Sequence, residues 1–293
     1  MVHRIGVIGL GIMGSAMSGH LLDAGYEVHG FDIVDEKVDA FTARGGVAHP
    51  SGADVARASE LVRLSLPSVE ALETATADVA AGVHQGLVVA EMGVFPIEAK
   101  ERAQAALEAA GAVFMDVPVS GTGLQAADAT LVVMASGPEE AFEATKDVFD
   151  TIGRATYYLG AVPNGSIMKF IANLLVSIHN LSSAEAHTLG IAAGMDPNVV
   201  QEVISDGVGT SAIFEIRGPM MVADSYDPPS ARLDTIKKDT TIIQAFARSV
   251  GAPTPLLDAA LPVYEASSGE GLGDLDAAAL CRHLERLGGI ERA

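Results

Sequence analysis

The segment Gly9-Leu-Gly-Ile-Met-Gly14 constrains the fold of this chain more than any other feature of its sequence. An apolar run precedes it and helix-like sequence follows it, so the glycines stand in a predicted strand–turn–helix unit. In that setting Gly9 permits a tight turn, Gly11 lets a pyrophosphate approach the backbone, and Gly14 lets the helix pack closely on the strand. The segment therefore predicts a dinucleotide-binding fold, with the phosphates on the helix N-terminus.

Short apolar runs alternate with helix-like segments through the first half of the chain. We expect strands over residues 5–8, 27–31, 61–66, 87–90, 113–117 and 131–135, and helices over 13–24, 35–44 and 97–110. Because parallel strands need crossover connections, this alternation predicts a mostly parallel sheet that is covered by helices on both faces.

The pattern changes after about residue 160. Residues 166–193 contain no Pro and a single Gly, and their apolar residues recur at helical spacing. Asn164-Gly-Ser and Gly194 supply start and stop signals, so we expect one long helix, followed by further helices between Pro/Gly breaks. The sequence therefore predicts an α/β fold class: an N-terminal Rossmann-type domain over 1–162, an all-helical C-terminal domain over 163–293, and an active site in the cleft between them.

The chain is strongly acidic, with 18 Lys and Arg against 38 Asp and Glu and a formal net charge of −20. Nucleic acid and anionic membranes need a concentrated positive surface, so neither is an expected partner. No apolar run reaches the ~18 residues of a membrane-spanning helix. A single cysteine, Cys281, excludes a disulfide within the chain and a cysteine-based metal site. We expect a cytoplasmic protein that acts on a small molecule.

Asp32 ends the second predicted strand. A carboxylate at this position binds both ribose hydroxyls of NAD and repels the 2′-phosphate of NADP, and no Arg follows it immediately. We therefore expect NAD as the cofactor. The expected cofactor contacts also include Ile12 and Met13 in the glycine turn, and Leu66 and Pro67 at the end of the strand predicted over residues 61–66.

Four ordered segments resemble those of the β-hydroxyacid dehydrogenases, the family that includes 3-hydroxyisobutyrate dehydrogenase and tartronate semialdehyde reductase. Gly9-Leu-Gly-Ile-Met-Gly-Ser-Ala-Met is similar to the family's opening, and Asp116-Val-Pro-Val-Ser-Gly to its substrate segment. Gly165-Ser-Ile-Met-Lys-Phe-Ile-Ala-Asn resembles its catalytic helix, and Lys238-Asp239 resembles its C-terminal pair. The resemblance covers nearly the whole chain and implies reversible hydride transfer between nicotinamide and a β-hydroxyacid.

Lys169 and Asn173 are the expected catalytic residues. They are four residues apart on the predicted long helix and therefore share one face. A buried lysine can have its pKa lowered toward neutrality and act as a general acid/base. The resemblance implies that Lys169 exchanges the proton of the substrate oxygen, and that Asn173 holds the substrate hydroxyl or orients the lysine.

The expected substrate-binding residues are Ser120, Gly121, Thr122 and Asp239. A hydroxyl and open backbone amides after a strand can hold a carboxylate without net positive charge. The resemblance implies that Ser120 and Gly121 bind the substrate carboxylate, that Asp239 lies near the substrate, and that Lys238 lies near the nicotinamide.

Four of the positions that depart from the family pattern predict a reshaped pocket. Gly93 stands where the family has Thr and Ala231 where it has Phe, so each removes volume from the pocket wall. Thr122 and Gln125 place larger polar side chains where the family has Gly. We expect a pocket that is wider on the nicotinamide side and more polar near the acid group, and that accepts a bulkier or more polar hydroxyacid than 3-hydroxyisobutyrate. The side chains of Phe95 or Phe214 could instead refill the pocket space.

Several alternative functions also remain open. An imine reductase shares the fold but typically replaces the lysine at position 169, and a 6-phosphogluconate-type decarboxylase has a much longer chain. A non-catalytic dinucleotide sensor should tolerate loss of Lys169 and Asn173, yet both are present.

The long predicted helix bears on two further expectations. His179 and His187 lie on it eight residues apart, which does not suit ligands of one ion, so we expect no metal. Long interdomain helices with apolar flanks often bury against a second subunit, so we expect a homodimer or homotetramer.

Overall fold

The computed structural model describes residues 2–292. In it, the glycine turn joins the first strand of a parallel sheet to the first helix of the chain. The sheet has the order β3-β2-β1-β4-β5-β6, and each neighbouring pair is parallel, as predicted. Its strands are β1 (Arg4–Ile8), β2 (Glu27–Phe31), β3 (Val47–Ala48), β4 (Leu61–Leu64), β5 (Val88–Glu91) and β6 (Val113–Asp116). Strand order reverses beside β1, which is where doubly wound sheets bind ligands.

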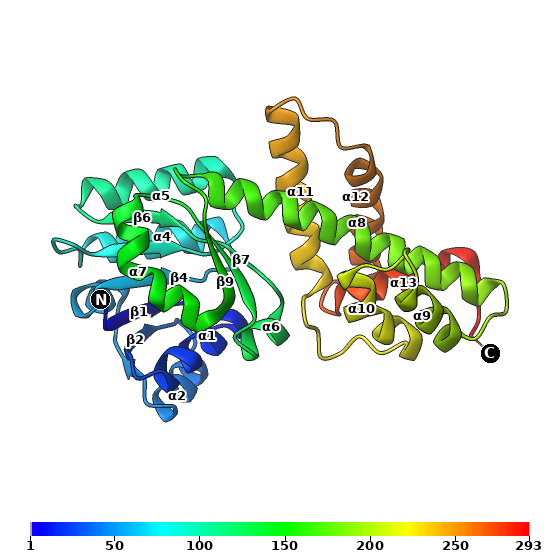
Figure 1. Cartoon of the computed structure of the whole chain (residues 1–293), viewed down its shortest axis with the longest axis horizontal. Helices are drawn as coiled ribbons and strands as arrows, with labels where there is room; N and C mark the ends of the chain where they lie inside the picture. The colour runs from blue at the N-terminus through cyan, green and yellow to red at the C-terminus, as the bar shows by residue number, and fades with distance from the viewer. Residues whose placement is uncertain (1, 293) are drawn as a thin grey trace. The chain divides into compact units, whose positions relative to one another are not determined.

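Helices cover both faces of this sheet (Figure 1). Side chains of alternate strand residues point to opposite faces, and each face has its own apolar core. One core includes residues of α1 (Ile12–Asp23), α2 (Asp35–Ala43) and α7 (Glu139–Ile152). The other includes residues of α3 (Gly52–Ala58), α4 (Val69–Ala80) and α5 (Ile97–Ala109). Burial on both faces explains why the strands read as continuous apolar runs.

A second, smaller sheet follows β6 and has the order β7-β8-β9. β7 (Val119–Ser120) is antiparallel to β8 (Leu131–Ala135), and β8 is parallel to β9 (Gly153–Tyr158). The short helix α6 (Gly123–Ala127) lies between β7 and β8 in the chain. The antiparallel pair was not expected, because β7 has only two residues and shows no periodicity of its own.

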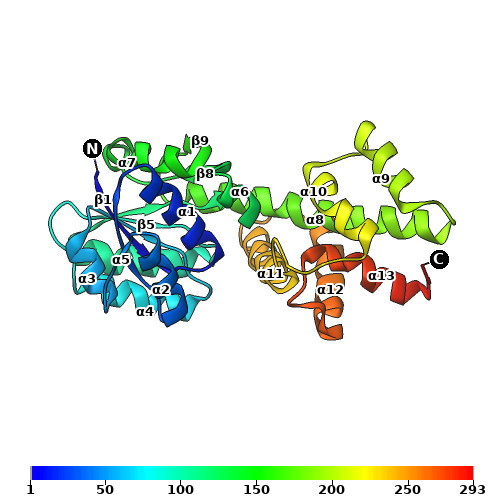
Figure 2. The same ribbon diagram turned by 90° about the horizontal axis from the view of Figure 1, so that it is seen from below.

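From residue 170 to residue 292 the regular elements are helices only, apart from one isolated bridge between Arg232 and Asp276. The long helix α8 (Asn164–Ala192) is unbroken over 29 residues, as predicted. The other α-helices, seen from below in Figure 2, are α9 (Pro197–Asp206), α10 (Ala212–Ala223), α11 (Leu233–Ser249), α12 (Pro255–Ser267) and α13 (Leu280–Gly288). A short π-helix (Ser268–Leu272) and a 3-10 helix (Ala277–Ala279) lie between α12 and α13. Their apolar core includes Met221, Leu233 and Tyr264.

The chain divides into two compact units, Met1–Lys169 and Phe170–Ala293. The division falls within α8, directly after Lys169, whereas the sequence predicted a boundary at residue 162. The first turn of α8 belongs to the sheet unit because it hydrogen-bonds with Asp116 and Ser136. None of the helices described here is long and apolar enough to cross a membrane.

Cys281 lies fully buried near the start of α13. Burial raises the pKa of its thiol to about 12, and the thiol contacts Thr188 and Glu285. The side chain therefore packs as a small apolar residue rather than as a reactive thiolate.

Candidate functional site

The glycine turn between β1 and α1 is shaped by close backbone contacts. Gly9 has a φ of +94°, and a Cβ on it would lie 2.2 Å from the Ser65 carbonyl oxygen, so only glycine fits. A Cβ on Gly14 would lie 1.9 Å from the Gly9 carbonyl oxygen, which shows how closely α1 starts against the loop. A Cβ on Gly11 would meet no atom within 4 Å. The turn therefore leaves open space at one of its three glycines.

No side chain caps the first turn of α1, where Gly11 is the N-cap. Backbone amides at a helix start have no acceptor within the helix, and with the helix dipole they favour an anion. Ile12 is exposed, while Met13 packs partly buried against the sheet core. Open space beside uncapped amides fits the pyrophosphate of a dinucleotide.

Asp32 follows β2, and its carboxylate is held by backbone donors. Oδ2 accepts a hydrogen bond from the Leu10 amide at 2.7 Å, and Oδ1 accepts one from the Val34 amide at 3.0 Å. Lys37 Nζ lies 3.6 Å from Oδ2. The carboxylate is thus fixed against the glycine turn, where a Rossmann-type site places its ribose-binding acid.

Leu66 and Pro67 follow β4 rather than ending it, because the strand stops at Leu64. The Ser65 amide donates to the Ile8 carbonyl at 2.9 Å, so the chain leaves β4 beside the end of β1. Leu66 packs against the core of one sheet face, and Pro67 is exposed. Both residues therefore lie at the carboxyl edge of the sheet with the glycine turn.

The predicted substrate segment differs from expectation in its local structure. Ser120 lies within β7, opposite Val132, and not in an open loop after a parallel strand. Gly121 has a φ of +137°, and a Cβ on it would lie 2.7 Å from Leu131 Cδ2, so the position requires glycine. Thr122 then begins α6 as its N-cap.

Thr122 and Gln125 bond to each other in a capping box at the start of α6. Gln125 Oε1 accepts hydrogen bonds from the Thr122 amide at 2.8 Å and from the Thr122 hydroxyl at 2.7 Å. The Thr122 hydroxyl accepts one from the Leu124 amide at 3.3 Å. These polar groups stabilise the helix start, a local use that comparison with the family pattern alone did not reveal.

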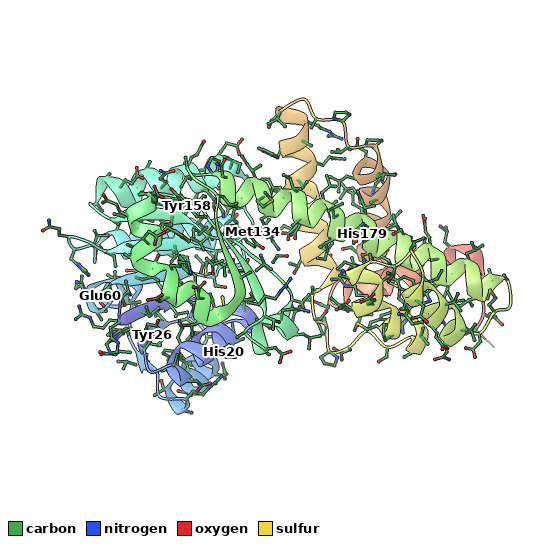
Figure 3. The ribbon with its side chains drawn as sticks, in the orientation of Figure 1. His20, Tyr26, Glu60, Met134, Tyr158 and His179 are labelled. Atoms are coloured by element: carbon green, nitrogen blue, oxygen red, sulfur yellow. The ribbon has the colours of Figure 1, made fainter. Side chains whose placement is uncertain are left out.

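His20 on α1 hydrogen-bonds to the C-terminal end of α6. Its Nε2 lies 3.0 Å from the Ala126 carbonyl and 2.9 Å from the Ala127 carbonyl, so it donates to the last turn of α6. Figure 3 labels this side chain on α1. Both ends of α6 are therefore fixed, one by the capping box and one by His20.

Position 93 is not open space, contrary to the wider pocket predicted there. A Cβ on Gly93 would lie 2.4 Å from Phe95 Cε2 and 2.8 Å from Glu91 Oε1. Phe95 is 1% exposed, so its ring fills the volume that a threonine would take. Phe214, the other side chain considered, instead stacks on His187 with ring centroids 5.0 Å apart.

Lys169 and Asn173 lie one turn apart on α8, and both are buried, with 9% and 7% exposure. Asn173 Nδ2 donates to Asp239 Oδ2 at 2.9 Å. Lys238 Nζ lies 3.1 Å from Asp239 Oδ1. Asn173, Asp239 and Lys238 thus form one continuous set of polar contacts between α8 and α11. These contacts fix the orientation of the Asn173 amide.

A cluster of fully buried charges escaped sequence reasoning. Glu91 ends β5, Asp116 ends β6, and Lys100 on α5 contacts both of them. Burial raises the pKa of the Glu91 carboxyl. One feature of the sequence could have indicated the cluster: an acidic residue ends each of the two neighbouring apolar strands. Glu91 and Asp116 therefore both lie at the edge of the sheet where such folds bind ligands.

The two histidines of α8 were the candidates for a metal site on this helix. His187 Nε2 lies 3.0 Å from Gln201 Oε1, and burial lowers the pKa of the ring. His179 lies on the same helix (Figure 3). Within residues 2–292 no three His, Cys, Asp or Glu side chains are grouped to hold a metal ion.

Comparison with known proteins assigns both parts of the chain. Residues 4–160 match the family described as the NAD binding domain of 6-phosphogluconate dehydrogenase. Residues 163–284 match the family described as NAD-binding of NADP-dependent 3-hydroxyisobutyrate dehydrogenase. The L-threonate dehydrogenase of Cupriavidus necator is 34% identical over 286 residues, which cover 96% of each chain. The chain belongs to the β-hydroxyacid dehydrogenase family. It is therefore an oxidoreductase that uses a nicotinamide dinucleotide and a small-molecule substrate.

Other relatives of this β-hydroxyacid dehydrogenase agree with the assignment. The 2-(hydroxymethyl)glutarate dehydrogenase of Eubacterium barkeri is 31% identical, over 98% of this chain and 96% of the relative. The crystal structure of 3-hydroxyisobutyrate dehydrogenase from Salmonella typhimurium superposes with a TM-score of 0.88 at 29% identity, covering 95% of this chain and 99% of that one. An imine reductase of Streptomyces aurantiacus, at 21% identity and a TM-score of 0.61, shares the fold alone.

Proposed function

We propose that this dehydrogenase transfers a hydride between NAD(H) and a β-hydroxyacid, with Lys169 as the general acid/base. The observation that carries the proposal is the pair Lys169 and Asn173, buried one turn apart on α8. A buried lysine beside a fixed amide suits proton exchange with a substrate oxygen better than it suits a solvated surface role.

Each proposed residue has one task in this reaction. The bound nicotinamide accepts or supplies the hydride. Lys169 takes the proton from the substrate hydroxyl in the oxidative direction and returns it to the carbonyl oxygen in the reductive direction. Asn173, which Asp239 orients, donates a hydrogen bond to the same substrate oxygen or to the group that carries it. Lys238 forms an ion pair with Asp239 and holds its side chain in place.

The substrate carboxylate is proposed to bind the segment from Ser120 to Thr122. The Ser120 hydroxyl and the backbone at Gly121 can donate hydrogen bonds without adding charge to an acidic protein. Because Gln125 engages the Thr122 hydroxyl, the Thr122 side chain contributes rigidity rather than a free hydroxyl. A rigid segment lowers the entropy cost of binding a small anion.

The proposed oligomer and compartment are a homodimer or homotetramer in the cytoplasm. Leu189 on α8 and Leu287 on α13 are 72% and 76% exposed, and both line one apolar depression of the helical unit. Large exposed apolar side chains that gather on one face mark protein contacts. A monomeric mass by light scattering would contradict the oligomer.

The position of Asp32 leads to a prediction for cofactor choice. We expect higher kcat/KM with NAD than with NADP, because the carboxylate would face the 2′-phosphate of NADP. Asp32→Asn should narrow the preference, since it removes the charge and leaves Lys37 nearby to attract the phosphate. Steady-state kinetics with both cofactors measures this. Equal or better efficiency with NADP in the unaltered enzyme would overturn the prediction.

Substrate size is the subject of a further prediction, which also tests the proposed reaction. We expect L-threonate and 2-(hydroxymethyl)glutarate, named for two of the relatives, to give higher kcat/KM than 3-hydroxyisobutyrate. The physical reason is Ala231, which packs partly buried against the core of the helical unit and which the family resemblance assigns to the pocket wall in place of Phe. Each missing methylene at such a wall is worth ~1–3 kcal/mol in discrimination. Phe95 already fills position 93, so Ala231→Phe alone should restore preference for the small acid.

The measurement is the rate of NADH formation with each acid at matched concentrations. A higher efficiency with 3-hydroxyisobutyrate would refute the substrate class while leaving the reaction type in place. No NADH formation with any hydroxyacid, together with no oxidation of NADH by aldehyde acids, would refute the proposed function itself.

A further inference from the structure

A buried cluster of three charges lies at the carboxyl edge of the large sheet. Lys100 Nζ is 2.6 Å from Asp116 Oδ1 and 2.6 Å from Glu91 Oε2. All three side chains have 0% exposure. They come from α5 and from the last residues of β5 and β6, which are neighbouring strands in register at this point. The Lys100 ammonium therefore links the ends of β5 and β6. The chain continues from β5 to Gly93 and from β6 to the predicted substrate segment around Ser120.

Asp116 continues this link into the first turn of α8. Its Oδ2 accepts a hydrogen bond from the Ser166 amide at 2.6 Å, and its Oδ1 accepts one from the Ser166 hydroxyl at 2.9 Å. The carboxylate thus satisfies a backbone amide at the helix start, where the helix dipole favours negative charge. Lys169 follows Ser166 by three residues and lies on the same side of the helix.

The backbone before Ser166 is held just as closely. The Gly165 amide donates to Ser136 Oγ at 2.9 Å, and that hydroxyl donates to the Asp116 carbonyl at 3.2 Å. A Cβ on Gly165 would lie 2.6 Å from the Asp116 carbonyl oxygen and 2.7 Å from that of Met134. The start of α8 therefore rests directly on the backbone of β6 and β8, and a side chain at residue 165 would push it away.

Glu91 extends the cluster in the other direction. Its Oε1 accepts a hydrogen bond from the Gly93 amide at 2.6 Å, and its Oε2 contacts Lys100. Gly93 belongs to the segment that the family resemblance places at the pocket wall. The same ammonium thus holds the end of this segment and, through Asp116, the start of α8.

Stability alone does not account for such a cluster. Burying three charges costs several kcal/mol of desolvation for each ion, and apolar side chains of similar volume often stabilise as well or better. Although burial would lower the pKa of Lys100, the Asp116 and Glu91 carboxylates raise it on balance, so the ammonium stays charged. A charged cluster does fix geometry, because three of its four carboxylate oxygens accept hydrogen bonds from specific donors and Glu91 Oε2 forms an ion pair with Lys100.

We propose that Glu91, Lys100 and Asp116 are positioning residues that set the first turn of α8 and thereby the place of Lys169 Nζ. This inference rests on the proposed function, in which Lys169 exchanges the proton. None of the three needs to touch the substrate. They act through Ser166 and Gly165 on one side and through Gly93 on the other.

The test is Asp116→Asn, with Asp150→Asn as the matched control. Both oxygens of Asp116 receive hydrogens, so an amide NH₂ at either position meets a donor instead of an acceptor. Asp150 pairs with Lys146 on the exposed face of α7 in the same unit, outside the first turn of α8. The substitution is chemically identical and spares the start of α8.

We expect Asp116→Asn to lower kcat by about tenfold to a hundredfold, since a misplaced catalytic group loses that much. The affinity for NADH should stay within about twofold, because the glycine turn and Asp32 are untouched. The pH at which kcat falls should also move, which a loss of folded protein alone would not cause. Asp150→Asn should change none of these. Equal kcat and pH profiles in both variants would overturn the proposal.

A second measurement does not depend on turnover. Reductive methylation with ¹³C labels the lysines, and the NMR signal that Lys169→Arg removes is that of Lys169. Its chemical shift and titration midpoint should change in Asp116→Asn and not in Asp150→Asn. An unchanged signal would refute positioning even if the wild-type enzyme proved inactive on hydroxyacids, so the two proposals fail separately.

Ser166→Ala keeps the test decisive if Asp116→Asn does not fold. It removes one hydroxyl donor and leaves the buried ion cluster complete. We expect kcat to fall by about twofold to tenfold, in line with one buried hydrogen bond. An unaltered kcat with an unaltered Lys169 signal would contradict the proposal.

Discussion

Lys169→Ala should lower kcat/KM by about 10²- to 10⁴-fold, the usual contribution of a general acid/base. The loss follows from the proposed role, in which Lys169 exchanges the proton of the substrate oxygen. The affinity for NADH should stay almost unchanged, since we assign cofactor binding to the glycine turn and Asp32, which lie outside α8. Steady-state rates and a fluorescence titration of NADH measure the two effects separately.

Lys146→Ala is the matched control for this prediction. Lys146 lies on the exposed side of α7 in an ion pair with Asp150, so its removal should leave both rates and affinity unaltered. A Lys169→Ala enzyme that kept more than about a tenth of wild-type kcat/KM at every pH would refute the assignment. A parallel loss of NADH affinity would indicate a damaged fold instead.

Gly11→Thr should abolish dinucleotide binding while the protein keeps its stability. A Cβ at this position meets no protein atom within 4 Å, and the φ of −70° suits any residue, so the folded chain can accept the side chain. Threonine also serves as an N-cap about as well as glycine. The added atoms would occupy the space that we assign to the pyrophosphate, and we expect binding to weaken at least about 100-fold, or ~3 kcal/mol.

Gly14→Ala provides the contrast. Its Cβ would lie 1.9 Å from the Gly9 carbonyl oxygen, so the loop must move and the free energy of unfolding should drop by about 1–3 kcal/mol. Thermal melts and NADH titrations of both variants distinguish the cases. Tight NADH binding by a folded Gly11→Thr protein would show that the phosphates do not lie at this turn.

The fold was predictable because its largest features are local. Apolar runs of strand length alternate with helical segments, and the glycine turn fixes the direction of the first crossover. The two-residue strands β3 and β7 escaped prediction because such short segments form only when a partner strand is already in place. The strand predicted over residues 61–66 ends at Leu64 in the structure, because the chain turns away after the Ser65 amide bonds to the Ile8 carbonyl.

The candidate site could be predicted only in part, because some of its contacts join residues that are distant in the sequence. Lys169, Asn173 and Asp32 stand in motifs, so the sequence singled them out. Lys100 reads as one more charged residue of an exposed helix, and only the three-dimensional structure shows that it is buried between two carboxylates. Likewise, the volume at Gly93 seemed free from the sequence, because nothing local predicts where the Phe95 ring turns.

The burial of Cys281 makes this chain convenient for site-specific labelling. Because the sole thiol is enclosed and protonated at neutral pH, thiol reagents should spare the native protein. A cysteine introduced at an exposed site such as Ile33, which is 89% accessible, would then carry a fluorophore or spin label without any background substitution. Conversely, slow modification of Cys281 itself would time the transient opening of the helical core around α13.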